Sequence, residues 1–248
     1  MVFVMILSGC APGWNAMTVN KQEAAPELDT SRFLVAMEDE PDTVDFQCTS
    51  IHYTIAQNVF NRLVEMEADA NGNMMILPSL AESWDVSDDG RTYTFHLRKD
   101  VLFSNGSALT ASDVEYTFVR LLTHPNSCNR DIADGIVGAE ALENGRADAL
   151  EGFTILNDYD FSITLESPFQ AFLACLSMPG ASILDRETTE KAGDRFGKDP
   201  AWTIGTGSFI LWKWTPGEGL LRSFIQGRRR VHPGGGAVRQ ERYPRHSG

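Results

Sequence analysis

The stretch from Leu80 to Leu122 constrains the fold of this 248-residue chain more than any other, because it combines turn, strand and helix signals. Tyr93, Phe95 and Leu97 alternate with polar residues, which is the period of a strand with one buried face. Residues 87–90, Ser-Asp-Asp-Gly, precede that strand and are typical turn residues. Apolar residues two apart precede the turn, so we predict an antiparallel hairpin here.

The second half of the same stretch predicts a capped helix. Asn105 and Gly106 form the dipeptide that tight turns favour. Thr110 followed three residues later by Asp113 resembles a capping box, which marks the start of a helix. The apolar residues that follow share one helical face: Val114, Phe118, Leu121 and Leu122. The stretch therefore predicts a hairpin, a loop and a helix, and it contains no catalytic arrangement.

Residues 80–118 resemble the signature region of family 5 of the extracytoplasmic solute-binding proteins, and they read LAESWDVSDDGRTYTFHLRKDVLFSNGSALTASDVEYTF. A second mark is residues 205–211, GTGSFIL, which resemble the family's GTGPy turn and strand with Ser208 in place of proline. The members of this family are the oligopeptide-, dipeptide- and nickel-binding components of ABC importers. The resemblance extends to about Leu221.

The resemblance implies a mixed α/β fold, namely the first lobe of a type II periplasmic-binding-protein-like architecture with an inserted, hairpin-rich sub-domain. We expect the lobe to cover residues 31–221, with the main sheet in 31–50 and 203–221 and the sub-domain within 51–202. The pattern inside this range predicts an amphipathic helix over 51–66 and a second hairpin over 153–165. We expect the second lobe of the family to be missing from this chain.

The first ten residues, MVFVMILSGC, resemble a partial lipoprotein signal peptide in which Cys10 is lipidated. No basic residue precedes Lys21, so we expect the true start to lie upstream of Met1. The alternative is an ordinary apolar N-terminus with an incidental cysteine. Residues 11–30 are small and polar, as in a linker between an anchor and a folded body.

The last residues, 222–248, differ in charge from the rest of the chain. They hold seven basic residues and one acid, a balance of +6, whereas residues 1–221 carry 14 − 33 = −19. Family similarity ends at the same point, so we expect a disordered, non-homologous tail in a chain that is truncated or frameshifted after about residue 221. The alternative is a basic tail that binds nucleic acid or anionic lipid. The net charge of the whole chain, −13, argues against a general nucleic-acid binder.

The candidate ligand contacts lie in an acidic loop and in a glycine-rich turn. Loops at the carboxyl ends of strands in α/β sheets are natural ligand positions, and the resemblance places both segments near the family's cleft. The candidates are Met37, Glu38, Asp39, Glu40, Gly205, Thr206 and Gly207. A solvated acidic loop is the alternative for the first group. A phosphate loop is excluded for the second, because no Gly-Lys-Ser/Thr follows.

We expect no catalytic residue, no cofactor and no metal site. The carboxylate pairs Glu38/Glu40 and Asp42/Asp45 are candidates for a general acid and base, but the sequence around them shows no apolar neighbourhood that would raise the pKa of one carboxyl. The histidines His52, His96 and His124 lack ligand spacing and are interpreted as structural. In an oxidising compartment two of Cys48, Cys128 and Cys175 can pair, and the sequence does not choose which; buried unpaired cysteines are the alternative.

The resulting functional hypothesis is a substrate-binding lipoprotein of an ABC importer that captures peptides or a similar small solute, here as an incomplete copy. We expect it to be a monomer, exported to the periplasm or cell surface, lipid-anchored to the membrane and partnered by the permease, with no nucleic acid and no enzymatic activity. The alternatives are a nonfunctional gene fragment and a nickel-, haem- or opine-binding member of the family. We expect the residues that select the ligand to lie mostly in the missing second lobe, so the sequence does not identify the ligand.

Overall fold

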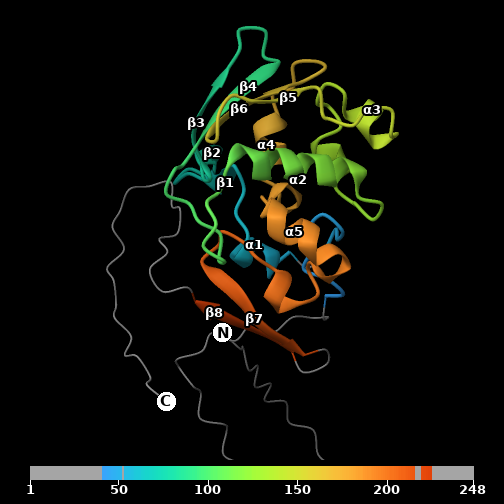
Figure 1. Ribbon diagram of the computed structural model, residues 1–248. Coiled ribbons are helices and arrows are strands. Elements are labelled where there is room, and N and C mark those ends of the chain that lie inside the picture. The colour runs from blue at the N-terminus through green and yellow to red at the C-terminus, as the bar shows by residue number, and fades with distance from the viewer. Residues whose placement is uncertain (1–40, 52, 216–218, 225–248) are drawn as a thin grey trace, which may run out of the picture. The chain divides into compact units, whose positions relative to one another are not determined.

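The computed structural model describes residues 41–51, 53–215 and 219–224, and Figure 1 shows how their helices and strands are arranged. The first elements are α1 (Ala56–Val59), β1 (Val64–Ala68), β2 (Met74–Pro78), β3 (Ala81–Val86), β4 (Thr92–Leu97) and α2 (Ala111–Thr123). The remaining helices and strands are α3 (Ala139–Glu143), β5 (Phe153–Ile155), β6 (Asp160–Thr164), α4 (Phe172–Leu176), α5 (Arg186–Ala192), β7 (Phe209–Thr215) and β8 (Gly219–Phe224). Short 3-10 turns lie at Arg130–Ile132, Pro179–Ala181, Gly193–Arg195 and Pro200–Trp202.

The largest sheet has four antiparallel strands in the order β3-β4-β6-β5. Both predicted hairpins are part of it, since β3 pairs with β4 and β5 pairs with β6. Gly90 turns the first hairpin with φ 69°, a left-handed conformation that a Cβ would strain. The alternation predicted for β4 is confirmed, because Tyr93, Phe95 and Leu97 are buried while their neighbours are partly exposed.

The predicted helix is confirmed as α2, and its capping box forms. The backbone N–H of Thr110 donates to the Asp113 carboxylate at 2.9 Å, and the Thr110 hydroxyl donates to the same oxygen at 2.9 Å. The predicted apolar face is entirely buried: Val114, Phe118, Leu121 and Leu122. Capping fixes where the helix begins, and the apolar face fixes its rotation against the sheet.

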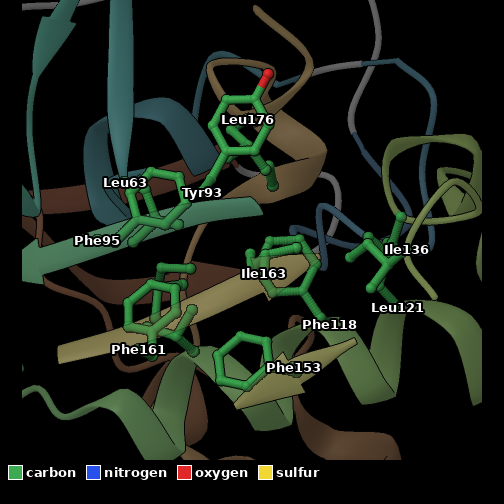
Figure 2. Packing of buried hydrophobic residues seen from close by; sticks show 14 of the residues in the cluster. Leu63, Tyr93, Phe95, Phe118, Leu121, Ile136, Phe153, Phe161, Ile163 and Leu176 are labelled. Atoms are coloured by element: carbon green, nitrogen blue, oxygen red, sulfur yellow. The ribbon is translucent and has the colours of Figure 1, made fainter. Parts of the chain in front are cut away.

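The core lies between α2 and the four-stranded sheet, and aromatic rings fill much of it (Figure 2). The Phe161 ring stacks on Phe153 with centroids 5.0 Å apart and on Phe95 with centroids 5.3 Å apart. Phe118 reaches this stack from α2, 6.3 Å from Phe153. The register pairs Phe95 with Phe161 across β4 and β6, so cross-strand partners on one face form the stack.

The helix predicted over residues 51–66 is confirmed only in its middle and is wrong at both ends. Only α1 forms there, and Phe60 adopts an extended conformation with φ −118° and ψ 150°. The chain then enters β1, which pairs with β2 around a turn in which the Asp69 carboxylate accepts two backbone N–H groups. The apolar residues that follow a helical period are indeed buried, but most of them lie outside α1, in irregular segments and at the start of β1.

The segment expected to form the main sheet is only partly within the described residues. β7 pairs with β8, which extends to Phe224, beyond the boundary placed at residue 221. Residues 41–50 form no strand, and the rest of the predicted first segment lies outside the described residues, as do residues 1–30 and most of the tail. The mixed α/β class is confirmed. No helix in the described part of the chain is long and apolar enough to cross a membrane.

Candidate functional site

The predicted turn Gly205–Gly207 lies in close contact with the backbone of α1. A Cβ on Gly205 would lie 2.1 Å from the Val59 carbonyl oxygen, and one on Gly207 would lie 2.4 Å from the Asn58 carbonyl oxygen. Both distances are far below van der Waals contact with backbone atoms that cannot rotate away. Glycine is therefore required here for close approach of two backbones.

Hydrogen bonds hold this turn in place from three sides. The Gly207 N–H donates to the Val59 carbonyl at 2.8 Å, and the Ser104 N–H donates to the Gly205 carbonyl at 2.9 Å. The Asn61 side-chain amide donates to the Thr206 carbonyl at 3.2 Å. The turn is thus preformed, because each of its residues is bonded to a segment distant in the sequence.

Thr206 in this turn and Arg62 carry buried polar atoms that have no hydrogen-bond partner. The Thr206 hydroxyl has no partner, and neither do Nε and Nη1 of Arg62, the residue after Asn61. The remaining Arg62 nitrogen, Nη2, contacts Glu65 at 3.2 Å. Buried polar groups without partners cost free energy, and a water, an ion or a bound ligand can satisfy them.

Of the predicted acidic loop, Met37, Glu38, Asp39 and Glu40 lie outside the described residues, but its continuation ends in a buried ion pair. Asp45 is 4% exposed and its carboxylate contacts Arg120 of α2 at 2.6 Å. A second Arg120 nitrogen donates to the Gln47 side-chain oxygen at 2.5 Å. Asp45 is committed to this pair, so the Asp42/Asp45 carboxylates do not form an acid/base pair.

The same segment is anchored at its other side by Gly197. The Val44 N–H donates to the Gly197 carbonyl at 2.7 Å, and the Thr43 hydroxyl donates to the same oxygen at 3.2 Å. A Cβ on Gly197, whose φ is 74°, would lie 2.5 Å from the Asp45 nitrogen. The segment that follows the acidic loop is therefore fixed in position at Val44 and Asp45.

A polar pocket of about 380 Å³ lies between the C-terminal end of α2 and α5, and no sequence pattern predicted it. Arg120, His124, Glu190 and Asp194 bring both charge signs to its wall. Burial, and then the Arg120 charge, lower the pKa of His124. The lining residues come from two segments that are far apart in the sequence, so no local motif predicts the pocket.

His96 and the cysteines have structural environments. His96 Nδ1 lies 2.6 Å from the Asp160 carboxylate, and Nε2 lies 3.3 Å from Asp85. Cys48, Cys128 and Cys175 are all unpaired. Within the described ranges, no group of three or more His, Cys, Asp or Glu side chains is placed to hold a metal ion.

Comparison with known proteins shows which family the chain is similar to. The family model described as bacterial extracellular solute-binding proteins, family 5 middle, matches residues 76–222. Di/tripeptide-binding protein 1 of Pseudomonas aeruginosa (strain UCBPP-PA14) is 32% identical over 203 residues, which are 76% of this chain and 36% of that protein. Heme-binding protein A of Haemophilus influenzae is 31% identical over 221 residues, 84% of this chain and 39% of that protein.

Solved structures share the fold. The substrate-binding domain of an oligopeptide ABC transporter from Bacillus anthracis str. Ames superposes with a TM-score of 0.66 at 28% identity, over 74% of this chain and 36% of that one. The chain spans between 36% and 39% of the length of the first curated relatives that it matches.

Proposed function

This chain belongs to family 5 of the bacterial extracellular solute-binding proteins, and from that membership we propose that it serves an ABC importer by capturing peptides or a similar small solute outside the cytoplasmic membrane. The observation that carries the proposal is the family match over residues 76–222. Relatives named for di- and tripeptide binding, at about a third identity, support peptides as the solute.

Within this function, we place one wall of the ligand site at the Gly205–Gly207 turn and the acidic loop Met37–Glu40. Support comes from the Thr206 hydroxyl, which is buried beside a preformed turn and lacks a hydrogen-bond partner. A peptide bond or terminus has both donors and acceptors and would satisfy it. The acidic loop would attract the positive end of the solute.

The share of the relatives that this chain spans predicts weak binding by the 248 residues alone. A solute held by one wall keeps most of its surface in water, and enclosed sites bury most of a ligand. We expect an isotope-labelled chain, titrated with a pool of di-, tri- and tetrapeptides, to show millimolar binding with amide shifts around Gly205–Gly207. Micromolar binding by calorimetry would show that the chain holds a complete site. If the peptides caused no amide shifts around Gly205–Gly207, the proposed position of the ligand wall would be wrong.

A pair of threonine variants separates ligand contact from structure. Thr206→Val removes the unpartnered hydroxyl, so we expect unchanged or slightly raised stability together with loss of the shifts that the peptides cause. Thr203→Val is the matched control, because the buried Thr203 hydroxyl donates to the Asp199 carbonyl at 2.9 Å. It should lower the unfolding midpoint and leave peptide binding intact. Equal binding by wild type and Thr206→Val would place the ligand elsewhere.

Haem is the second candidate solute, because Heme-binding protein A of Haemophilus influenzae is 31% identical over a longer stretch than the peptide-binding relative reported above. Titration with haemin, followed by the Soret band, distinguishes the two. A saturable shift with no response to the peptide pool would replace peptides by haem. If neither haemin nor the peptide pool binds, both candidate solutes are contradicted, and the other solute classes of the family remain.

Lipid anchoring, the permease partner and a monomeric, non-enzymatic state complete the proposal. Cys10 would carry the lipid, and the support is the sequence pattern Leu7–Cys10 alone. The test is expression in a bacterial host with a basic leader segment added upstream of Met1, followed by detergent phase partitioning: the wild type should enter the detergent phase, and Cys10→Ser should remain in the aqueous phase. An aqueous wild type would remove the anchor without affecting the solute-binding proposal.

A further inference from the structure

Cys48 and Cys128 are held side by side by the backbone. The Cys128 N–H donates to the Gln47 carbonyl at 2.8 Å, and that carbonyl belongs to the peptide bond leading into Cys48. With standard bond lengths, this hydrogen bond keeps the two Cα atoms within about 7 Å even in its most extended geometry. Disulfides span Cα separations of about 4.4 to 6.8 Å, so this hydrogen bond holds the two cysteines near the spacing that a disulfide needs.

The segments that carry the two cysteines are also fixed to each other. The Asn129 side-chain amide donates to the carbonyls of Phe46 and Thr49 at 2.9 and 3.0 Å. The Gln47 side-chain amide donates to the Thr117 carbonyl at 2.9 Å. Hydrogen bonds therefore hold the two cysteine-bearing segments against each other, and a disulfide between them requires little further ordering of the backbone.

The side chains differ in exposure, and a base lies beside one of them. Cys128 is exposed, so an external reagent can reach its sulfur and its side chain has room to change rotamer. Cys48 is half-buried, with Sγ 3.2 Å from His124 Nδ1. The Asn126 N–H donates to the same His124 nitrogen at 3.3 Å, so Nδ1 is the unprotonated nitrogen of the ring.

We propose that Cys48 and Cys128 form a disulfide when the protein is exported, with Cys128 as the entry point for the oxidant and His124 as the base that activates Cys48. Family members are extracellular, where thiols meet oxidising conditions that the cytosol does not provide. The disulfide would tie the exit of the acidic loop to the loop after α2.

The oxidant is a second disulfide, such as oxidised glutathione or an oxidised thiol–disulfide oxidoreductase. The Cys128 thiolate attacks it, which forms a mixed disulfide and releases one thiolate. Cys48 then passes its proton to His124 Nδ1 and attacks the Cys128 sulfur, releasing the second thiolate, which takes up the proton. Two protein thiols are oxidised, and one disulfide is reduced to two thiols.

The pKa of Cys48 explains why the base matters. Burial, and then the Asp45 carboxylate, raise the pKa of the Cys48 thiol to about 12, with Cys128 adding to the rise. Without a proton acceptor the thiolate would be scarce at neutral pH, and only the thiolate attacks. Burial lowers the pKa of His124, which keeps the ring neutral and leaves the Nδ1 lone pair open to the Cys48 proton. The same shift makes the ring a weaker base, so the proton moves to Nδ1 only as the Cys48 sulfur attacks.

The first experiment maps the bond in the full chain carrying Cys10→Ser. The protein is incubated in an oxidised/reduced glutathione buffer, alkylated and digested without reduction for mass spectrometry. We expect a Cys48–Cys128 linked peptide and an alkylated Cys175. Three alkylated cysteines, a bond to Cys175, or glutathione left on Cys128 as the end product would overturn the proposal.

The second experiment follows stability and rate. Oxidation should raise the urea midpoint of the parent and of Cys175→Ser, and it should leave Cys128→Ser unchanged; reduction of the parent should reverse the rise. His124→Asn keeps an acceptor for Asn126 but cannot take a proton, so we expect the mixed disulfide at Cys128 to close about tenfold more slowly or worse. Closure at the parent rate would remove His124 from the mechanism.

Discussion

Two regions of this molecule are held together by different means. The sub-domain built on the four-stranded sheet is held by apolar side chains, with Phe161 stacked between Phe95 and Phe153. The junction around Asp45 and the Gly205–Gly207 turn is held by a buried ion pair and by backbones in direct contact. The first tolerates changes that preserve volume, whereas the second depends on particular atoms.

This difference has a functional meaning for a solute-binding protein. A scaffold needs stability, which apolar burial supplies without directional requirements. The ligand wall proposed above needs polar groups held in fixed positions, and the hydrogen bond from Asn61 to Thr206 in the junction holds such groups. The predictions below test whether the two regions respond to substitution as differently as their contacts indicate.

The largest effect is expected for Arg120→Leu in the junction. It leaves the Asp45 carboxylate buried without its partner, and breaking such a pair costs about 3 to 5 kcal/mol. The matched control is Arg146→Leu, because Arg146 pairs with Glu140 at 2.7 Å but the two side chains are 61% and 83% exposed. Urea unfolding followed by circular dichroism should show a change below about 1 kcal/mol for the control.

The double variant Asp45→Asn/Arg120→Leu sharpens this result. It removes both charges, so part of the stability lost in Arg120→Leu should return. A double variant that is less stable than Arg120→Leu would show that Asp45 has other essential partners, and that the ion pair is not what holds the junction together.

The next effect is expected for Gly205→Ala. The added Cβ meets the Val59 carbonyl, so the two backbones must separate, at a cost of about 2 to 3 kcal/mol. Gly135→Ala is the control, since nothing lies within 4 Å of a Cβ built there. Thermal unfolding of both variants compares them. Equal midpoints would mean that the close approach is not required for stability.

Phe161→Leu tests the apolar region and should cost less, about 1 to 2 kcal/mol. The substitution keeps an apolar side chain of similar size but removes the stacked ring from the centre of the core. Phe169→Leu is the control, because Phe169 is 48% exposed. If Phe161→Leu cost more than Gly205→Ala in chemical unfolding, the ranking of the two regions would be reversed.

The smallest effect is a pH dependence at the surface of the sheet. Hydrogen bonds to Asp160 and then Asp85 raise the pKa of His96. A raised pKa in the folded state contributes stability fully below the unfolded value of about 6.5, and this is lost as pH rises through the folded pKa. His96→Thr should therefore lower the urea midpoint at pH 6 more than at pH 9. A pH-independent difference would contradict this assignment.

Sequence reasoning reached the apolar region and missed most of the junction. The alternation of Tyr93, Phe95 and Leu97 and the box at Thr110 are local patterns, so the hairpins and α2 were predicted with nearly correct bounds. The prediction of a helix over 51–66 was wrong because buried apolar residues of an irregular segment happen to follow a helical period.

The junction contacts join residues far apart in the chain, and so no local pattern encodes them. Asp45 meets Arg120 across 75 positions, and Asn61 meets Thr206 across 145. The turn Gly205–Gly207 was identified by family resemblance, and the reason for its glycines became clear only from their contact with α1. The roles of Met37–Glu40 stay a prediction.

One further consequence follows from the hydrogen bond between Ile183 and Asn61. The Ile183 N–H donates to the Asn61 carbonyl at 2.9 Å, so the chain enters and leaves the sub-domain at a single point. An insert whose ends meet tolerates new termini elsewhere in it without a change to its interior. Residues 62–183 are therefore a natural unit for circular permutation, whereas excision would separate Arg120 from Asp45 and Asn129 from Phe46.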